Sequence, residues 1–491
     1  MQRCVGPVLL CTLVVFHINS VERVVAQSSD QAAQNGDINL QPGNGANFVG
    51  APVTGAPASG SSATALTSIS GNPAAVNIIT GNGNLGKILG VNRNGWRLGG
   101  ATINDANGIL SGGLGPGLWA GQNLTLADVS FDADEAGCAD GAMFGSEFLF
   151  YNGYGAGPTV NGVEQSQGSP NALAGTVLGF NSLDSKPPVN RVELYQLWYR
   201  QVLFDEKMVV RVGKSVPTYD FGNVTRPVRM AEATSNIPAS SGAIMTPLYV
   251  NPTMLGVIPG YYNSATGIVI SLLPTENVYL QYGFYDGNGA TGSNTGDKGP
   301  QFTGHYFHIG EVGTHWIIGQ DKKPGKFGIG YWGQTGPLVT FSNTIENGAQ
   351  GVYLFGSQRL YWEEPGVSHN GLGAFYQFGS TNNDITFTQR YVGGGVTYYG
   401  LLPGRDNDSA GFAMGWGRMT NDPNAGKAYF TGYGPGPQPL GDHEWIYTWY
   451  YQIQVRDGLF LQPNLTYIPD PARVPGTPAA FPLTIQAVML F

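Results

Sequence analysis

The residues best suited to binding chemistry lie on one predicted hairpin. A turn centred between residues 205 and 206 places Arg200 directly opposite Arg211, with Trp198 and Gln196 on the same face of their strand. Guanidinium and amide groups donate hydrogen bonds, and an indole ring offers a flat apolar surface for stacking. These side chains therefore predict a wall that holds a polar solute weakly, without covalent chemistry.

The neighbouring strand supplies an acid to the same face. Phe148 and Phe150 alternate with Glu147, so an outward apolar face turns Glu147 inward. Two arginines directly opposite each other repel by a few tenths to about 1 kcal/mol, and we expect Glu147 to offset that repulsion. The alternative is that these strands form an ordinary wall, whose charges only keep the enclosed space hydrated.

A long connection follows this hairpin. Ser215–Thr266 spans about 50 residues, which is too long for a plain surface loop, and it carries Asp220, Arg226 and Arg229. We expect it to fold inward and narrow a pore. The alternative is an outer cap that covers the mouth.

Enzyme and metal motifs are weak. There is no Gly-x-Ser-x-Gly elbow and no His-Glu-x-x-His. His305 and His308 would point to opposite faces of a strand, so they cannot jointly hold a metal. The glycine-rich run at Gly112–Gly117 lacks the Lys-Ser/Thr of a phosphate loop. We therefore expect no enzyme, no metal and no cofactor.

The amino-acid composition predicts the type of secondary structure that positions these residues. Only 12% of the 491 residues are charged, about half the usual ~25%, whereas 74 are glycine and 12% are aromatic. These proportions favour an all-β protein. No apolar run is long enough for a membrane-spanning helix, and the net charge of −9 makes nucleic acid an unlikely partner.

Alternating residues divide the later part of the chain into hairpins. Ile268, Ile270 and Leu272 alternate with small or polar residues, and the pattern returns in the strands that follow. The apolar parity predicts a lipid face and the small-polar parity a lumen. Seven short turns are predicted, at Ala133–Gly141, Phe204–Lys207, Leu273–Asn277, Asp321–Gly325, Glu363–Asn370, Leu402–Asp408 and Arg456–Gly458.

Seven hairpins with one further strand at each end make sixteen strands. The first would lie near Trp96–Asn104 and the last at Phe481–Phe491. Short turns on one side and long loops on the other are typical of an outer-membrane barrel. The prediction is a transmembrane antiparallel β-barrel with short periplasmic turns and long extracellular loops.

The two ends of the chain predict export and assembly. Arg3 precedes the apolar stretch Val5–Phe16, and small residues at Val24–Ala26 fit a cleavage site, so residues 1–26 are a predicted signal peptide. Residues 27–85, rich in Gly, Ala, Ser and Asn, form a predicted periplasmic arm, and residues 86–491 the barrel. The last strand presents Phe491, Met489 and Ile485 on one face. It resembles the signal read by the barrel-assembly machinery of Gram-negative outer membranes.

Longer strings resemble a known family. RLGGATINDANGILSGGLGPGLW (97–119), NPTMLGVIPGYYNSATG (251–267) and GPQFTGHYFHIGE (299–311) are similar to the carbohydrate-selective porins of the OprB type. This resemblance covers about residues 94–491. It implies a sixteen-stranded barrel in the outer membrane of a Gram-negative bacterium, through which small sugars pass by facilitated diffusion.

The resemblance also implies the partners. These are small sugars, outer-membrane lipid and lipopolysaccharide, and the assembly machinery, with the protein a monomer or a trimer. In such a pore the aromatic face of Trp198 would stack on a sugar ring while the charged groups bind its hydroxyls. Three alternatives stay open: a general porin for other solutes, an outer-membrane barrel enzyme such as a lipase, and a secreted β-rich glycan-binding protein.

Overall fold

The structure is a computed structural model that describes most of the chain from Asn84 onward. The described residues are 84–160, 162–185, 190–204, 207–222, 245–259, 264–275, 277–288, 299–321, 323–365, 370–382, 384–430, 436–456 and 458–491. The predicted signal peptide and nearly all of the predicted arm lie outside these residues. A short helix, α3 (Asn84–Ile88), precedes the first strand.

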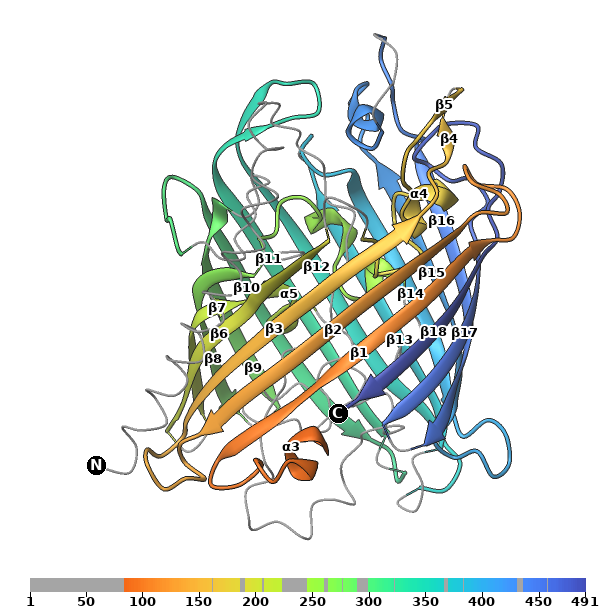
Figure 1. Ribbon diagram of the computed structural model, residues 1–491. Helices are drawn as coiled ribbons and strands as arrows, with labels where there is room; N and C mark the ends of the chain where they lie inside the picture. Colours follow the sequence, from red (N-terminus) through yellow and green to blue (C-terminus); the bar gives the residue numbers. More distant parts are fainter. Residues whose placement is uncertain are drawn as a thin grey trace.

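In this part of the chain, sixteen strands close into one antiparallel barrel (Figure 1). Each strand pairs with its neighbours in the chain, and the first strand pairs with the last. The strands are β1 (Trp96–Ile109), β2 (Trp119–Asp132), β3 (Ala142–Gly155), β6 (Arg191–Leu203), β7 (Met208–Ser215), β8 (Ala265–Thr275), β9 (Val278–Asp286), β10 (Tyr306–Ile318), β11 (Lys323–Val339), β12 (Ile345–Trp362), β13 (Gly371–Thr381), β14 (Thr388–Tyr399), β15 (Ser409–Met419), β16 (His443–Arg456), β17 (Leu459–Tyr467) and β18 (Pro482–Leu490). The predicted fold class and strand number are confirmed.

The predicted alternation places apolar side chains outside and polar ones inside. Leu272 and Leu280, on β8 and β9, are exposed at the outer surface, whereas Ser271 and Gln281, the next pair along the same two strands, are buried. Closure of the sheet satisfies the backbone groups of both edges, which is why a sheet can cross lipid only as a barrel. None of the described helices is long and apolar enough to cross a membrane.

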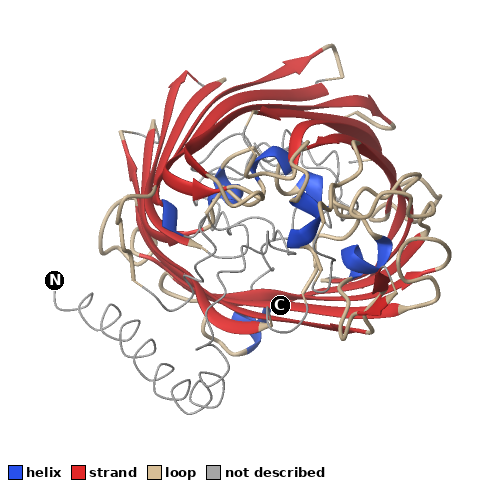
Figure 2. Ribbon diagram, turned by 90° about the horizontal axis from the view of Figure 1, so that it is seen from above, coloured by secondary structure: helices blue, strands red, loops and turns tan. Residues whose placement is uncertain are grey.

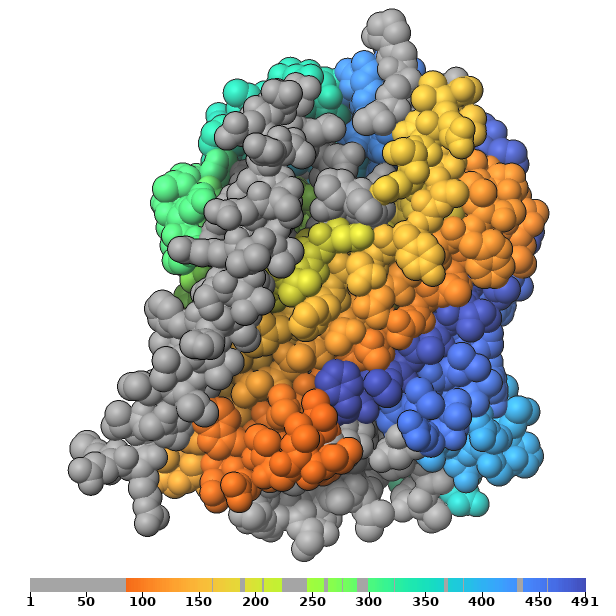
Figure 3. All heavy atoms as spheres, in the orientation of Figure 1, coloured from red at the N-terminus to blue at the C-terminus, as the bar shows by residue number. Residues whose placement is uncertain are grey.

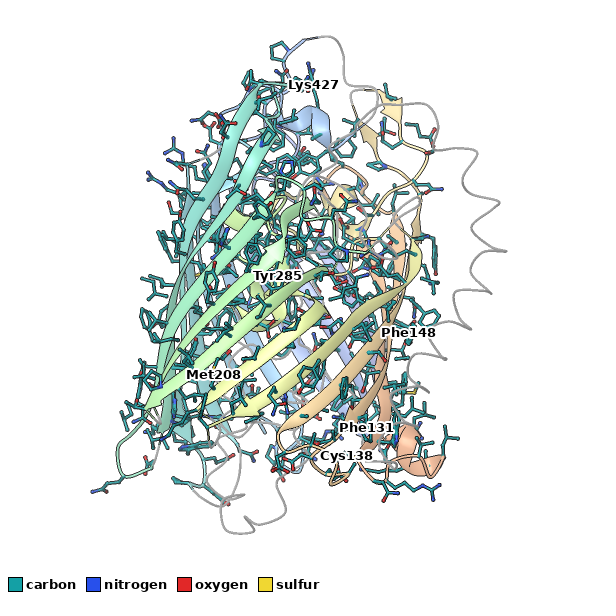
Figure 4. The ribbon with its side chains drawn as sticks, turned by 90° about the vertical axis from the view of Figure 1, so that its left-hand side faces the viewer. Phe131, Cys138, Phe148, Met208, Tyr285 and Lys427 are labelled. Carbon is teal, nitrogen blue, oxygen red and sulfur yellow. The ribbon has the colours of Figure 1, made fainter. Side chains whose placement is uncertain are left out.

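Short turns and long connections lie at opposite ends, as predicted. Figure 4 shows Met208, beside a short turn, at one end and Lys427, in the long connection between β15 and β16, at the other. One predicted turn is displaced: β10 ends at Ile318, and Gly319 turns the chain with a φ of 73°. Gly325 therefore lies inside β11, paired with Gln358, rather than in the turn.

Described parts of two long connections pack inside the ring of strands (Figure 2). The connection between β3 and β6 contains α4 (Pro170–Ala174) and, near its start, the small hairpin of β4 (Thr159–Val160) and β5 (Val163–Glu164). The connection between β7 and β8 contains α5 (Pro217–Asp220) and two 3-10 turns, η2 (Thr246–Leu248) and η3 (Pro252–Met254). Their apolar side chains share one buried cluster with the inner face of the strands. A further 3-10 turn, η5 (Ala425–Ala428), lies in the connection between β15 and β16.

Candidate functional site

The β6–β7 hairpin has the predicted register. Arg200 pairs with Arg211 and Trp198 with Gly213. Leu197 and Tyr199 are exposed on the outer surface, while Trp198 between them is only 6% exposed. Trp198 therefore belongs to the inner wall and not to an interfacial aromatic belt. A methyl group at Gly145 of β3 would collide with the indole ring of Trp198. The absence of a side chain at Gly145 therefore leaves room for this ring against the wall.

A bulge in β6 brings two consecutive side chains to the inner face. Glu147 pairs with Gln196 but Phe148 pairs with Leu194, so Tyr195 is the extra residue and both Tyr195 and Gln196 are buried. Gln196 Nε2 donates a hydrogen bond to Glu147 Oε1 at 2.9 Å. The inward placement of Glu147 and Gln196 is as predicted, and the amide holds the carboxylate against the wall.

The carboxylate that pairs with Arg211 is Asp220, at the end of α5. The Asp220 side chain is 2% exposed and the Arg211 side chain 11%. The predicted site residues Arg211 and Asp220 are thus brought together, and their ion pair ties the β7–β8 connection to the wall. Arg226 and Arg229, in the same connection, lie outside the described residues.

Glu311, on β10, also attaches the β7–β8 connection to the barrel wall. It accepts hydrogen bonds from the backbone N–H of Gly222 at 2.7 Å, from the Tyr279 hydroxyl at 2.6 Å and from the Tyr353 hydroxyl at 2.8 Å. Farther along the connection, Asn251 Nδ2 donates to the Phe378 carbonyl of β13. The described parts of the β7–β8 connection therefore fold into the barrel, as predicted, and contact strands as far round as β13.

The β3–β6 connection is fixed by a second buried carboxylate. Glu444 of β16 accepts hydrogen bonds from the Thr176 hydroxyl and from the backbone N–H groups of Val177 and Leu178. The two connections also meet, because the Thr246 N–H donates to the Gly179 carbonyl at 3.1 Å. The described parts of the two connections thus lie inside the barrel and are attached to several of its strands.

Comparison with known proteins identifies the family. Residues 127–481 match the model of the carbohydrate-selective porin, OprB family. The chain belongs to the OprB family. Porin B of Pseudomonas aeruginosa is 25% identical over 313 residues, which cover 57% of this chain and 64% of Porin B, so the match spans less than two thirds of that relative.

Solved structures show the same fold. The high-pH structure of Pseudomonas putida OprB has a TM-score of 0.64 at 18% identity, and the alignment covers 83% of this chain and 96% of that one. The low-pH structure of the same protein gives a TM-score of 0.51 at 14% identity over the same shares of each chain. These alignments show that this OprB-family chain shares the barrel fold of the solved OprB structures.

The OprB-family barrel has site residues that the sequence analysis missed. Arg359 on β12 is buried with its guanidinium 4.1 Å from the Trp362 ring and 5.1 Å from the Tyr399 ring. Such stacking positions a cation against aromatic faces on the inner wall. Arg359 and Glu311 both face inward, but the inward parity of β10 also carries Phe307 and Ile309, so alternation alone does not single out Glu311. Among the described residues, no group of three or more acidic, His or Cys side chains could hold a metal.

Proposed function

We propose that the protein gives passive diffusion to small sugars, which contact the inner wall of the β6–β7 hairpin where the two connections narrow the lumen. The observation that carries this proposal is the Arg200–Arg211 pair beside the inward-facing Trp198. Guanidinium donors bind hydroxyl groups, and an indole face stacks on the C–H face of a sugar ring. Contacts of this kind are weak enough to let a solute leave.

Exposure divides the proposed lining into two roles. Arg200 and Arg211 are partly exposed, so they are the groups that meet a solute first, whereas Trp198, which is 6% exposed, offers only a small part of its ring. Glu147, Gln196 and Asp220 are buried and hydrogen-bonded, so they position the wall. Arg226 and Arg229 belong to the same connection, and we propose them as further lining residues on sequence grounds alone.

We also propose roles for the two ends of the chain. Residues 1–26 are a signal peptide and residues 27–85 a periplasmic arm. The arm assignment is supported by the position of β1, which starts at the end of the barrel with the short turns. Phe491, Met489 and Ile485 are proposed as the assembly signal, because Met489 and Ile485 lie on the lipid face of β18, 40% and 36% exposed.

Liposome swelling tests this function. Purified protein in liposomes is exposed to monosaccharides, disaccharides and amino acids of overlapping size. We expect monosaccharides to enter faster than amino acids of similar size. Rates that follow solute size alone would indicate a general porin instead. No swelling with any solute, from correctly folded barrels, would exclude an open channel.

A further inference from the structure

Two arginines face each other on the outer surface of the barrel. Arg390 on β14 pairs directly with Arg418 on β15, and both side chains are exposed. Val392, two residues from Arg390, is 50% exposed, whereas Tyr391 between them is 1% exposed and belongs to the buried core. Alternate residues of a strand share one face, and so do directly paired residues of neighbouring strands. Both arginines therefore lie on the outward face.

A histidine lies beside this pair, at the end of the barrel with the long connections. His443 is exposed, pairs with Arg418 and is the first residue of β16. β14 begins two residues before Arg390, and β15 ends one residue after Arg418. Figure 4 marks this end by Lys427, which lies in the connection between β15 and β16. We call Arg390, Arg418 and His443 the outer basic cluster.

Aromatic side chains separate the outer basic cluster from the middle of the strands. Trp416, two residues before Arg418, pairs with Trp445, two residues after His443, and their ring centroids are 6.4 Å apart. Trp445 also stacks on Tyr447, with 5.9 Å between ring centroids. Such rings are typical of a membrane interface. Two residues span about 7 Å along a strand, so the cluster lies just outside the hydrocarbon, at the level of lipid headgroups.

The described part of the chain supplies no anion to the two arginines. Among its residues, neither guanidinium group has an ion pair or a hydrogen-bond acceptor. The carboxylate of Asp384, which precedes β14, instead accepts hydrogen bonds from Gln389 Nε2 at 3.3 Å and from Thr420 Oγ1 at 3.2 Å. Like charges directly opposite each other on two strands repel. An anion that binds both guanidinium groups would remove this repulsion.

We propose that the outer basic cluster binds the phosphate groups of lipopolysaccharide. The OprB family places this barrel in the outer membrane of a Gram-negative bacterium, and lipopolysaccharide forms the outer leaflet there, on the side of the long loops. Guanidinium groups bind phosphate oxygens through paired, charge-assisted hydrogen bonds. The acyl chains of the same lipid would lie along the aromatic rings and the apolar face next to them. This inference concerns the lipid around the barrel and is independent of which solute passes through the pore.

The test measures how purified full-length protein, freed of bound lipid in detergent, binds lipid A, the phosphorylated membrane anchor of lipopolysaccharide. Native mass spectrometry measures the bound lipid, and heat-modifiable migration shows that each variant is folded. Arg390→Gln/Arg418→Gln should bind at least about tenfold more weakly than the wild type, because two charge-assisted contacts are lost. Lys87→Gln/Arg93→Gln is the matched control and should bind like the wild type. It removes two exposed positive charges from α3 and the segment after it, at the short-turn end of the barrel, which is at the bottom of Figure 3.

A second measurement uses the wild type alone and so does not depend on the folding of a variant. Lipid A from which both phosphates have been removed should bind at least about tenfold more weakly than lipid A that carries both, and millimolar inorganic phosphate should not displace the lipid. Equal binding of the two lipids, no binding of either, an Arg390→Gln/Arg418→Gln variant that binds like the wild type, or an equal loss in both double variants would overturn the proposal. Displacement by inorganic phosphate would overturn it in favour of a free anion as the ligand.

Discussion

At the scale of single residues, the most informative group is Arg211. The hairpin turn fixed its register, so its position opposite Arg200 could be predicted from sequence. Its ion pair with Asp220 could not be predicted, because Asp220 belongs to the β7–β8 connection, and the path of that connection depends on packing against distant strands. Glu147 shows the same limit: its inward direction follows from strand alternation, but its hydrogen bond from Gln196 depends on a bulge at Tyr195.

Replacing Arg211 with Ala should change ion selectivity more than folding. The substitution removes one positive charge at the constriction and leaves the Asp220 carboxylate beside it, so the pore should favour cations more than the wild type does. The barrel hydrogen bonds are untouched, and heat-modifiable migration should persist. Reversal potentials in planar bilayers under a salt gradient measure the shift. Arg211→Lys keeps the charge and should stay near the wild type; an unchanged reversal potential for Arg211→Ala would remove this residue from the constriction.

Val212 tests the assignment of inner and outer faces on the same strand. Its side chain is 46% exposed on the outer surface, so Val212→Arg should cost about 2–4 kcal/mol near the bilayer midplane. Urea unfolding in lipid vesicles measures this loss, with Val212→Ile as the control. If Val212→Arg were silent while Arg211→Ala prevented folding, the two faces would be exchanged.

At the scale of elements, the strands were predictable and the connections only in part. Alternation and turn residues located the hairpins, because each strand must present one apolar face to lipid. The inward path of Ser215–Thr266 followed from its length. Its attachments did not, since Glu311 is a single carboxylate whose three donors come from β9, β12 and the connection itself.

Glu311→Gln should loosen the β7–β8 connection. The amide can replace only one of the two accepting oxygens, so at least one of the three donors loses its acceptor, at a cost of about 1–3 kcal/mol. We expect larger and noisier single-channel conductance and faster proteolysis within the connection. Glu364→Gln, at an exposed short turn, is the matched control. Conductance equal to the wild type would mean that Glu311 does not hold the constriction.

Deletion of Phe491 should lower the yield of folded protein in the outer membrane. Besides its role as a proposed assembly signal, its backbone N–H and C=O pair with Gly100 at 2.9 and 2.8 Å, which helps close the barrel. Quantitative unheated gels measure the folded fraction. Phe491→Tyr keeps both an aromatic end and the backbone pairing and should be nearly normal. A normal yield after deletion would show that neither recognition nor closure needs this residue.

At the scale of the whole molecule, sixteen strands enclose a lumen that holds the described parts of two inward connections, and barrel diameter grows with strand number. The strand number followed from local signals repeated along the chain. The outer surface of the assembled barrel did not follow so simply, because Thr102, Asn104, Asn123 and Thr125 face outward on β1 and β2.

The most direct test of the account is the ion current through a single reconstituted barrel during titration with a monosaccharide. A solute that binds the β6–β7 wall at the constriction should block the current in a saturable way. Arg200→Ala should raise the half-blocking concentration, while glycerol at matched viscosity should reduce the current only in proportion to viscosity. Sugar and glycerol giving the same non-saturating decrease, in the wild type as in Arg200→Ala, would contradict a sugar-binding constriction.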